Sequence, residues 1–343
     1  AIRRQRQMCI RDRSKIVELV EDYQAEQGVQ NYVTDIMHER VFEPLEIKKL
    51  ANRTRAYLKI QDGCSQFCSY CIIPYARGPI RSRQPEDVIA EVKRLAENGF
   101  KEVVLTGIHV ASYGKDLKTI TLIDIIRQVH EVEGIERIRF SSIEPNVVTE
   151  EFAAAMAELP KVCDHFHLSL QSGCDKTLKE MNRKYDTEKY RQAAALLRKY
   201  LPDVAITTDI IVGFPGETEE DYQASRAFAE EIGFSKIHVF PYSPKKGTPA
   251  AARKDQLQNV VKQERSHDLI TVSDRMTDAF LQKHVGKVMP VLFERCIGDD
   301  VYEGHTTNYM KVHARSTKDL SNVIADTKIL SVAEEMAFGE VEA

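Results

Sequence analysis

From residue 56 to residue 243, the sequence alternates between short apolar stretches and longer amphipathic ones. The apolar stretches predict six strands, at 56–60, 101–107, 135–142, 165–170, 204–213 and 236–243. The amphipathic stretches predict helices between them, at 85–99, 122–134, 149–159, 186–200 and 217–233. This alternation restricts the fold to an α/β protein with a parallel sheet, built either as a partial barrel or as a doubly wound sheet. In both architectures, function lies at the carboxyl ends of the strands.

The two ends of the chain differ from this central part. After a long helix predicted at 254–284, short alternating strands predict a small all-β barrel of about sixty residues. Near the start, a helix is predicted from Ser14 to Gln27, and residues 29–55 have no firm pattern and predict a linker. We expect the Arg-rich residues 1–13 to be a non-native tail, with a native basic tail as the alternative.

Composition limits the possible functions. The sequence has no apolar run near the roughly 18 residues that span a membrane, and no secretory signal opens it. Its seven cysteines are few for 343 residues and lack the spacing of a disulfide framework, so we expect a cytoplasmic protein that uses thiols for metal binding or catalysis. The net charge of −4 gives no global case for nucleic-acid binding, which would require a local basic patch.

Three cysteines, Cys64, Cys68 and Cys71, lie close together directly after the first predicted strand. A structural zinc site closes with four ligands, usually as two paired hooks, and the second hook is missing here. Thiolates also hold iron–sulfur clusters, and three thiolates on a four-iron cluster leave one iron open to a small molecule. A zinc site completed by a distant histidine or cysteine remains the alternative.

Polar residues follow the later strands, where a ligand would be expected. A glycine at the end of the second strand would let the backbone approach a ligand closely, and a carboxylate within an apolar strand requires a partner. A turn glycine, a solvated carboxylate and a surface arginine are the ordinary alternatives. The residues that we single out as candidate ligand contacts are Thr106, Gly107, Glu144, Ser169, Gln171, Arg183 and Asp209.

The spacing CxxxCxxC, with the aromatic residue Tyr70 before the last cysteine, resembles the signature of radical S-adenosylmethionine (SAM) enzymes. The whole set of motifs is similar to one branch of that family, the methylthiotransferases. The matching segments are 74–83, 105–114, 141–145, 168–173, 181–185, 213–218, 240–250, 285–294 and 304–312.

The resemblance implies a fold, cofactors and a reaction. It implies a radical SAM partial (β/α)6 barrel at 56–283, followed by a TRAM domain, a small RNA-binding β-barrel, at 284–343. The three cysteines would hold a [4Fe-4S] cluster whose open iron binds SAM, and cleavage of SAM would yield a 5′-deoxyadenosyl radical that abstracts hydrogen from the substrate. The cofactor-binding residues would be Tyr70 and the seven strand-end residues named above.

The resemblance also implies a substrate. Segments 107–114 and 141–145 look most like the subgroup that adds a 2-methylthio group to N6-threonylcarbamoyladenosine of tRNA, next to the anticodon. The alternatives are isopentenyladenosine in tRNA, an aspartate of a ribosomal protein or, without catalysis, a zinc-stabilised RNA-binding module. The expected partners are tRNA and an electron donor such as flavodoxin or ferredoxin, and we expect a monomer. We expect RNA contacts from Arg77, Arg81, Arg83, Lys311 and Arg315.

One departure from the family bears on activity. Complete methylthiotransferases have an N-terminal domain with three more cysteines and a second [4Fe-4S] cluster that supplies sulfur. Before Cys64 this sequence has only Cys9, within the suspected tail. We therefore expect residues 14–55 to be the remnant of that domain with a linker, and the chain to be truncated and unable to complete sulfur insertion.

Overall fold

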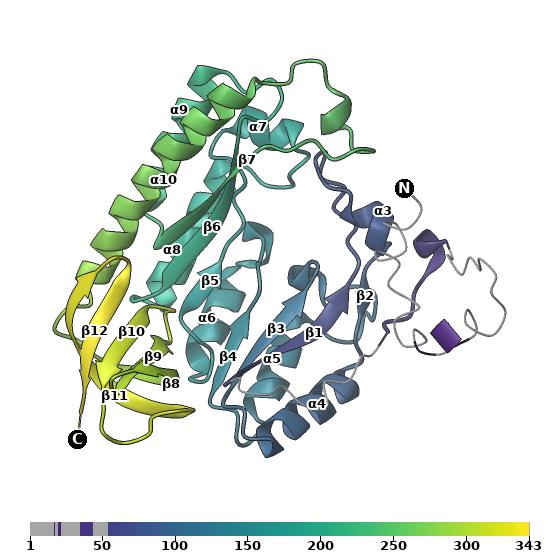
Figure 1. Cartoon of the computed structure of the whole chain (residues 1–343). Coiled ribbons are helices and arrows are strands. Elements are labelled where there is room, and N and C mark those ends of the chain that lie inside the picture. Colours follow the sequence, from purple (N-terminus) through teal and green to yellow (C-terminus); the bar gives the residue numbers. More distant parts are fainter. Residues whose placement is uncertain (1–16, 18–19, 22–34, 44–53, 343) are drawn as a thin grey trace.

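The computed structural model of the protein describes residues 17, 20–21, 35–43 and 54–342 (Figure 1). The expected tail at 1–13, most of the helix expected at 14–27 and most of the expected linker lie outside these residues; the described residues of that helix, Val17, Val20 and Glu21, are helical. Before the first strand, the described part contains a 3-10 helix, η1 (Ile36–His38), which Asp35 caps with its side chain. No helix among the described residues has both the length and the apolar character needed to cross a membrane.

The predicted strands form two small sheets rather than one. The first has the order β2-β1-β3-β4, in which β1, β3 and β4 are parallel and β2 pairs antiparallel with β1. The second has the parallel order β5-β6-β7, and isolated bridges such as Ile143 to Leu168 connect the two sheets. The strands are β1 (Arg55–Asp62), β2 (Arg81–Ser82), β3 (Glu102–Gly107), β4 (Arg137–Phe140), β5 (His165–His167), β6 (Ala205–Val212) and β7 (Lys236–Pro241).

Helices pack on the outer face of these sheets (Figure 1). Their ends follow local chemistry: Thr121 and Asp124 form a capping box at the start of α5, and Thr218 and Asp221 form one at the start of α9. The helices are α3 (Ile73–Arg77), α4 (Pro85–Glu97), α5 (Leu122–His130), α6 (Glu150–Glu158), α7 (Asp175–Glu180), α8 (Thr187–Tyr200), α9 (Glu219–Ile232) and α10 (Asn259–Gln282), with the 3-10 helices η2 (Val110–Ser112), η3 (Pro145–Val147) and η4 (Ala250–Ala252).

The two faces of the second sheet differ in polarity. On β6, Ile206 and Ile210 are fully buried against the helices, whereas Thr207 and Asp209 are half-buried on the opposite, inner face. Residues of a strand alternate between faces, so this pattern places apolar groups outside, under the helices, and polar groups inside. The inner face is therefore more polar and more accessible than the outer face that the helices cover.

The C-terminal part is a closed five-stranded barrel with the order β10-β12-β11-β8-β9, which confirms the predicted small β-barrel. Its core contains fully buried Val291, Phe293, Val312 and Ile329, and α10 leads into it. The α/β part and the small barrel together confirm the fold class predicted from sequence. The strands are β8 (Val288–Gly298), β9 (Val301–Thr306), β10 (Lys311–Arg315), β11 (Val323–Ala333) and β12 (Met336–Val341).

Three buried arginines at the amino ends of the first sheet hold this barrel in place. Arg137 donates to the carbonyl oxygens of Pro290 and His305, each at 2.8 Å. Arg139 donates at 2.7 Å to the carbonyl oxygens of residues 306 and 307 and at 2.9 Å to the Glu102 carboxylate, which also pairs with Arg55. The barrel is thus anchored at the edge opposite the carboxyl ends of the strands.

Candidate functional site

The loop that follows β1 contains the three cysteines. It begins at Gly63, whose φ of 71° lies in the left-handed region, and a Cβ there would come within 1.8 Å of the Pro79 carbonyl oxygen. Its path is then fixed by backbone hydrogen bonds from Cys64 to Gly78 and from Cys71 to Cys68, both 3.0 Å. Cys64, Cys68 and Cys71 are therefore held on one folded loop at the carboxyl end of the first strand.

The environment of the thiols suits a thiolate-bound cluster. Cys68 is buried and the other two are half-buried, and burial raises the pKa of Cys64 to about 11 and also raises that of Cys71. A positively charged metal centre would offset this cost, because metal ligation deprotonates a thiol. In the part of the chain that the structure describes, no three Cys, His, Asp or Glu side chains surround a point where a single ion could sit. A four-iron cluster binds each thiolate through a different iron, so the donor set fits it.

Glu144 connects three segments around this loop. It is only 6% exposed, and its carboxylate accepts from Arg183 at 2.8 Å and from Gln66 of the cysteine loop at 3.2 Å, while His109 lies 3.0 Å away. The sequence prediction of a ligand-facing carboxylate at this strand end therefore corresponds to a buried polar hub. Glu144 comes from the end of β4, His109 from the end of β3 and Arg183 from the turn after α7.

Charge around Glu144 keeps its carboxyl ionised. Burial alone would raise its pKa, but the hydrogen bond from His109 and the positive charges of Arg183 and Lys115 lower the pKa below its ordinary value. Arg183 also lies against the cysteine loop, since its Nη1 is 3.2 Å from the Cys68 sulfur. A guanidinium between a carboxylate and a cysteine thiol could orient the carboxylate of a bound ligand or stabilise a negatively charged group at the cysteine loop.

Gln171 and Tyr70 meet on the other side of the loop. The Tyr70 hydroxyl donates to the Gln171 side-chain oxygen at 3.1 Å. Strand β5 ends at His167, and Gln171 has a φ of 71°, so Ser169 and Gln171 do not alternate as residues of an extended strand would. Ser169 is buried, and its carbonyl oxygen accepts from Tyr185 at 2.7 Å.

Asp209 lies on the inner face of β6, apart from the Glu144 hub. Its partner is His167, whose Nε2 is 3.3 Å from the carboxylate, and the His167 ring stacks on His238 of β7. From the sequence we expected this carboxylate to have a partner, and that partner is a histidine of the neighbouring strand. The carboxylate side chain is 31% exposed, so it remains accessible from the inner face.

Thr106 and Gly107 end β3 next to β1. A Cβ at Gly107 would lie 2.8 Å from the side-chain oxygen of Gln61, so glycine is required for close packing of the two strands. Gln61, fully buried, accepts from the His109 backbone N–H at 2.8 Å and donates to the Gly63 carbonyl. Sequence reasoning missed Gln61, because β1 also contains Arg55, Lys59 and Asp62 and a further polar residue does not stand out.

The structure corrects part of the expected RNA-binding set. Arg81 and Arg83 are only 3% and 5% exposed; Arg83 is paired with Glu91, and Arg81 donates to the carbonyl oxygens of Arg77 and Pro79. Their guanidinium groups are buried and bind groups of the protein itself, so they are not available for bidentate hydrogen bonding to phosphate. Arg77 is partly exposed and lies 3.9 Å from Asp62.

The two basic residues expected in the barrel lie on β10. Lys311 is 3.6 Å from Glu303, and Arg315 is exposed at the strand end. The barrel segment 282–343 has seven Lys or Arg against ten Asp or Glu, so a positive surface there depends on how charges are segregated. These two residues remain predictions.

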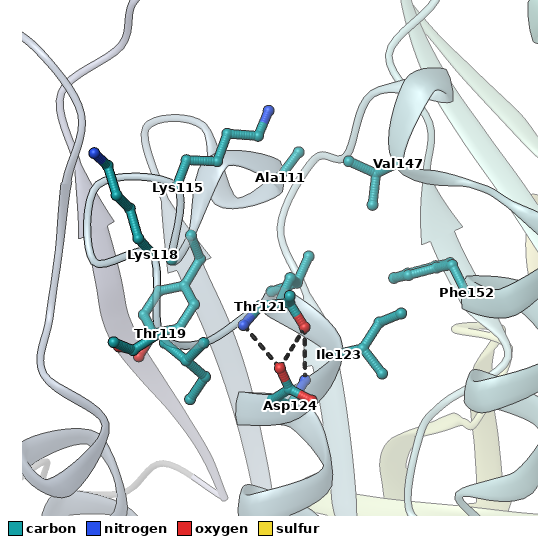
Figure 2. Close-up of a pocket in the computed structure, with 13 residues that line it drawn as sticks. Ala111, Lys115, Lys118, Thr119, Thr121, Ile123, Asp124, Val147 and Phe152 are labelled. Atoms are coloured by element: carbon teal, nitrogen blue, oxygen red, sulfur yellow. Dashed lines mark hydrogen bonds between the residues drawn. The ribbon is translucent and has the colours of Figure 1, made fainter.

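A pocket of about 510 Å³ adjoins the Glu144 hub on the segment that follows β3 (Figure 2). Figure 2 shows Lys115 and Lys118 at its rim and the apolar Ile123, Val147 and Phe152 along one side. At its base, the Thr121–Asp124 capping box satisfies its own polar groups. The pocket therefore combines an apolar wall with two ammonium groups, beside the site.

Comparison with known proteins places the chain in a family. Residues 58–229 match the Radical SAM superfamily. The threonylcarbamoyladenosine tRNA methylthiotransferase MtaB of Bacillus subtilis is 42% identical over 93% of this chain and 72% of that protein. The tRNA-2-methylthio-N(6)-dimethylallyladenosine synthase of Thermoanaerobacter sp. is 41% identical over 91% of this chain and 67% of that protein. The chain belongs to the radical SAM methylthiotransferases.

This radical SAM methylthiotransferase is therefore an enzyme, as the sequence motifs predicted. Solved structures are more distant: a radical SAM methyltransferase of Kitasatospora setae is 18% identical, covers 57% of this chain and 38% of that chain, and has a TM-score of 0.48. Within the family assignment, the loop with three cysteines lies where the motif predicts, directly after β1.

Proposed function

We propose that the protein is a tRNA methylthiotransferase that forms the 2-methylthio derivative of N6-threonylcarbamoyladenosine next to the anticodon. The observation that carries this proposal is the 42% identity to the Bacillus subtilis enzyme of that name over 93% of the chain. The identity to the isopentenyl-type (dimethylallyl) enzyme is 41%, so identity alone separates the two substrates poorly.

The proposed cofactors are one [4Fe-4S] cluster, held by Cys64, Cys68 and Cys71, and SAM. When bound, such a cluster supplies an open iron for SAM and the electron that cleaves its sulfonium. The chain's own residues bind and orient: Arg183 and Glu144 form an ion pair beside the cysteine loop, and Tyr70 holds the Gln171 amide in place. The remaining proposed SAM contacts are Thr106, Gly107, Ser169 and Asp209.

The pocket of Figure 2 supports the threonylcarbamoyl substituent over the isopentenyl one. The threonylcarbamoyl group carries a carboxylate, whereas the isopentenyl group is uncharged. Lys115 is close enough to Glu144 to lower its pKa, so its ammonium lies near the site, and Lys118 stands on the same rim. A buried or rim ammonium is a natural partner for a ligand carboxylate.

Nucleoside mass spectrometry of tRNA tests the proposal. The tRNA of cells that lack the full-length gene should contain threonylcarbamoyladenosine without its methylthio group. Loss of the methylthio group from isopentenyladenosine would instead assign the other tRNA substrate. An unchanged nucleoside profile, together with a lost modification on a ribosomal protein, would overturn the proposal of an RNA substrate.

A further inference from the structure

Two aromatic rings stand exposed at the rim of the cysteine loop. Phe67, directly before Cys68, is 40% exposed, and Tyr75 of α3 is 50% exposed. Their ring centroids are 5.7 Å apart in an edge-to-face arrangement. Neither ring contributes to the apolar core, so a large part of the hydrophobic free energy that full burial would give is not realised in the protein alone.

The backbone holds Phe67 outward. Its φ of 52° lies in the left-handed region, which is unfavourable for a bulky residue and costs about 1–3 kcal/mol. The segment after α7 stabilises this conformation, because Asn182 donates to the Phe67 carbonyl at 2.7 Å and the Ser69 N–H donates to the Met181 carbonyl at 3.0 Å. A strained conformation that is fixed by its surroundings is typical of a functional position.

A pair of lysines lies on a second loop that packs on the cysteine loop. The loop between β7 and η4 carries Lys245 and Lys246, both exposed, and neither ammonium is paired with a carboxylate among the residues that the structure describes. This loop packs on the cysteine loop: the Ala250 N–H donates to the Ser69 carbonyl at 2.8 Å, and a Cβ at Gly247 would lie 3.4 Å from the Ile72 side chain. In a chain with a net charge of −4, this is a local concentration of positive charge.

We propose that Phe67, Tyr75, Lys245 and Lys246, hereafter the rim surface, bind unpaired nucleotides of the RNA substrate next to the reacting base. Open aromatic faces stack on splayed bases, and flanking ammonium groups neutralise the connecting phosphates. A protein partner would require a pocket for its anchor side chain, whereas this ring pair is open. The proposal rests on the proposed function only in taking the substrate to be RNA.

Binding of a fluorescent RNA hairpin with an unpaired loop, followed by anisotropy, tests the rim surface. The ring deletions Phe67→Ala and Tyr75→Ala should each weaken hairpin binding about tenfold or more, while the ring-retaining Tyr75→Phe should bind as the parent does. Lys245→Gln with Lys246→Gln should weaken binding and reduce the slope of log affinity against log salt by about 0.7 per lost phosphate contact.

Matched variants control for unspecific effects. Ile270→Ala removes an apolar side chain that is 41% exposed on the outer helix α10, and Lys93→Gln with Lys189→Gln removes two positive charges from α4 and α8. Both should leave the hairpin affinity unchanged. A fully paired duplex, made of the hairpin strand and its complement, should bind more weakly than the hairpin. Tyr75→Ala and the parent should have the same affinity for this duplex. Iron content and SAM binding are measured for every variant, and Tyr75→Ala serves if Phe67→Ala fails to assemble the cluster.

The outcomes separate this inference from the proposed function. Ring deletions that bind the hairpin as tightly as the parent would overturn the rim surface and leave the RNA substrate standing. A parent protein that binds no hairpin would overturn both. Ring deletions that lose affinity for a ribosomal-protein peptide rather than for the hairpin would overturn the rim surface as an RNA site.

Discussion

The carboxyl and amino edges of the first sheet both contain a buried carboxylate paired with arginine, but the two pairs have different roles. At the carboxyl edge, Glu144 pairs with Arg183 beside the cysteine loop. At the amino edge, Glu102 pairs with Arg55 and Arg139 beneath the small barrel. Both carboxylates are buried and accept from arginines, and both have a lowered pKa despite a burial that alone would raise it.

The surroundings of the two ion-pair groups separate their roles. Arg137 and Arg139 use their remaining donors on backbone carbonyls of the barrel, and Arg55 donates to the Tyr309 hydroxyl and to the Glu294 carboxylate. The Tyr309 ring lies against Arg55 and Arg139, between the stacked rings of His165 and His305. The Arg183 group instead faces a cysteine sulfur, and a pocket with two rim lysines adjoins the Glu144 hub. A buried ion pair therefore indicates function only where its surroundings leave room for a ligand.

Loss of a cluster ligand is expected to have the largest effect. Cys68→Ala should abolish both iron retention and 5′-deoxyadenosine release, because two thiolates hold a four-iron cluster poorly. Anaerobic reconstitution followed by iron analysis and chromatography measures both quantities. Cys296→Ala, which removes an exposed thiol on β8, is the matched control and should behave as the parent. Normal deoxyadenosine release from Cys68→Ala would remove the basis for the cluster site.

Removal of the carboxylate at the amino edge should mainly reduce stability. Glu102→Gln leaves the guanidinium of Arg139 buried without its counter-charge and leaves Arg55 paired with Glu294 alone, and breaking a buried pair in this way costs about 3–5 kcal/mol. Chemical denaturation should report this as a lower free energy of unfolding. Glu136→Gln, whose side chain is 47% exposed and pairs with Lys101, should cost at most about 1 kcal/mol. Equal effects of the two variants would contradict the structural role of Glu102.

Sequence patterns predicted the elements better than they predicted side-chain environments. Strand and helix positions follow from local periodicity, and the cysteine loop follows from spacing, so the sequence alone predicts both. Burial of Arg81 and Arg83 depends on Asp62 and Glu91, which only the fold brings near them. The sequence of an arginine-rich segment does not show whether its side chains bind phosphate or pair with groups of the protein itself.

The division of the predicted parallel sheet also depended on tertiary structure. Strand β5 has only three residues, Gln171 beyond its end has a positive φ, and within the described part of the chain only isolated bridges connect the first sheet to the second. Likewise, the Glu144 hub takes side chains from three separate elements. Neither feature has a local signal, since each requires contacts between residues far apart in the chain.

At the carboxyl edge, the matching carboxyl-to-amide change should alter catalysis more than stability. Glu144→Gln keeps the shape but removes the charge that accepts from Arg183 and Gln66, and a hydrogen bond to a charged group contributes about 1.5–3 kcal/mol. We expect SAM cleavage to fall about tenfold while cluster content is retained. Glu158→Gln at the exposed end of α6 is the control. If Glu144→Gln instead lost as much stability as Glu102→Gln and cleaved SAM as the parent does, the two edges would not differ in their roles.

Lowering the pH should weaken the ion pairs at both edges, and the resulting loss of folding stability should be largest for the amino edge. Because the folded-state pKa of Glu102 is lowered from 4.5, its contribution to stability is complete above the unfolded-state pKa and is lost as the pH falls through the folded-state pKa. Asp164 nearby acts in the opposite direction, since burial raises its pKa. Denaturation midpoints measured from pH 7 downward should therefore fall less steeply for Glu102→Gln than for the parent. Parallel curves for the two proteins would show that Glu102 does not titrate with unfolding, and the amino edge would then owe its stability to packing and carbonyl contacts alone.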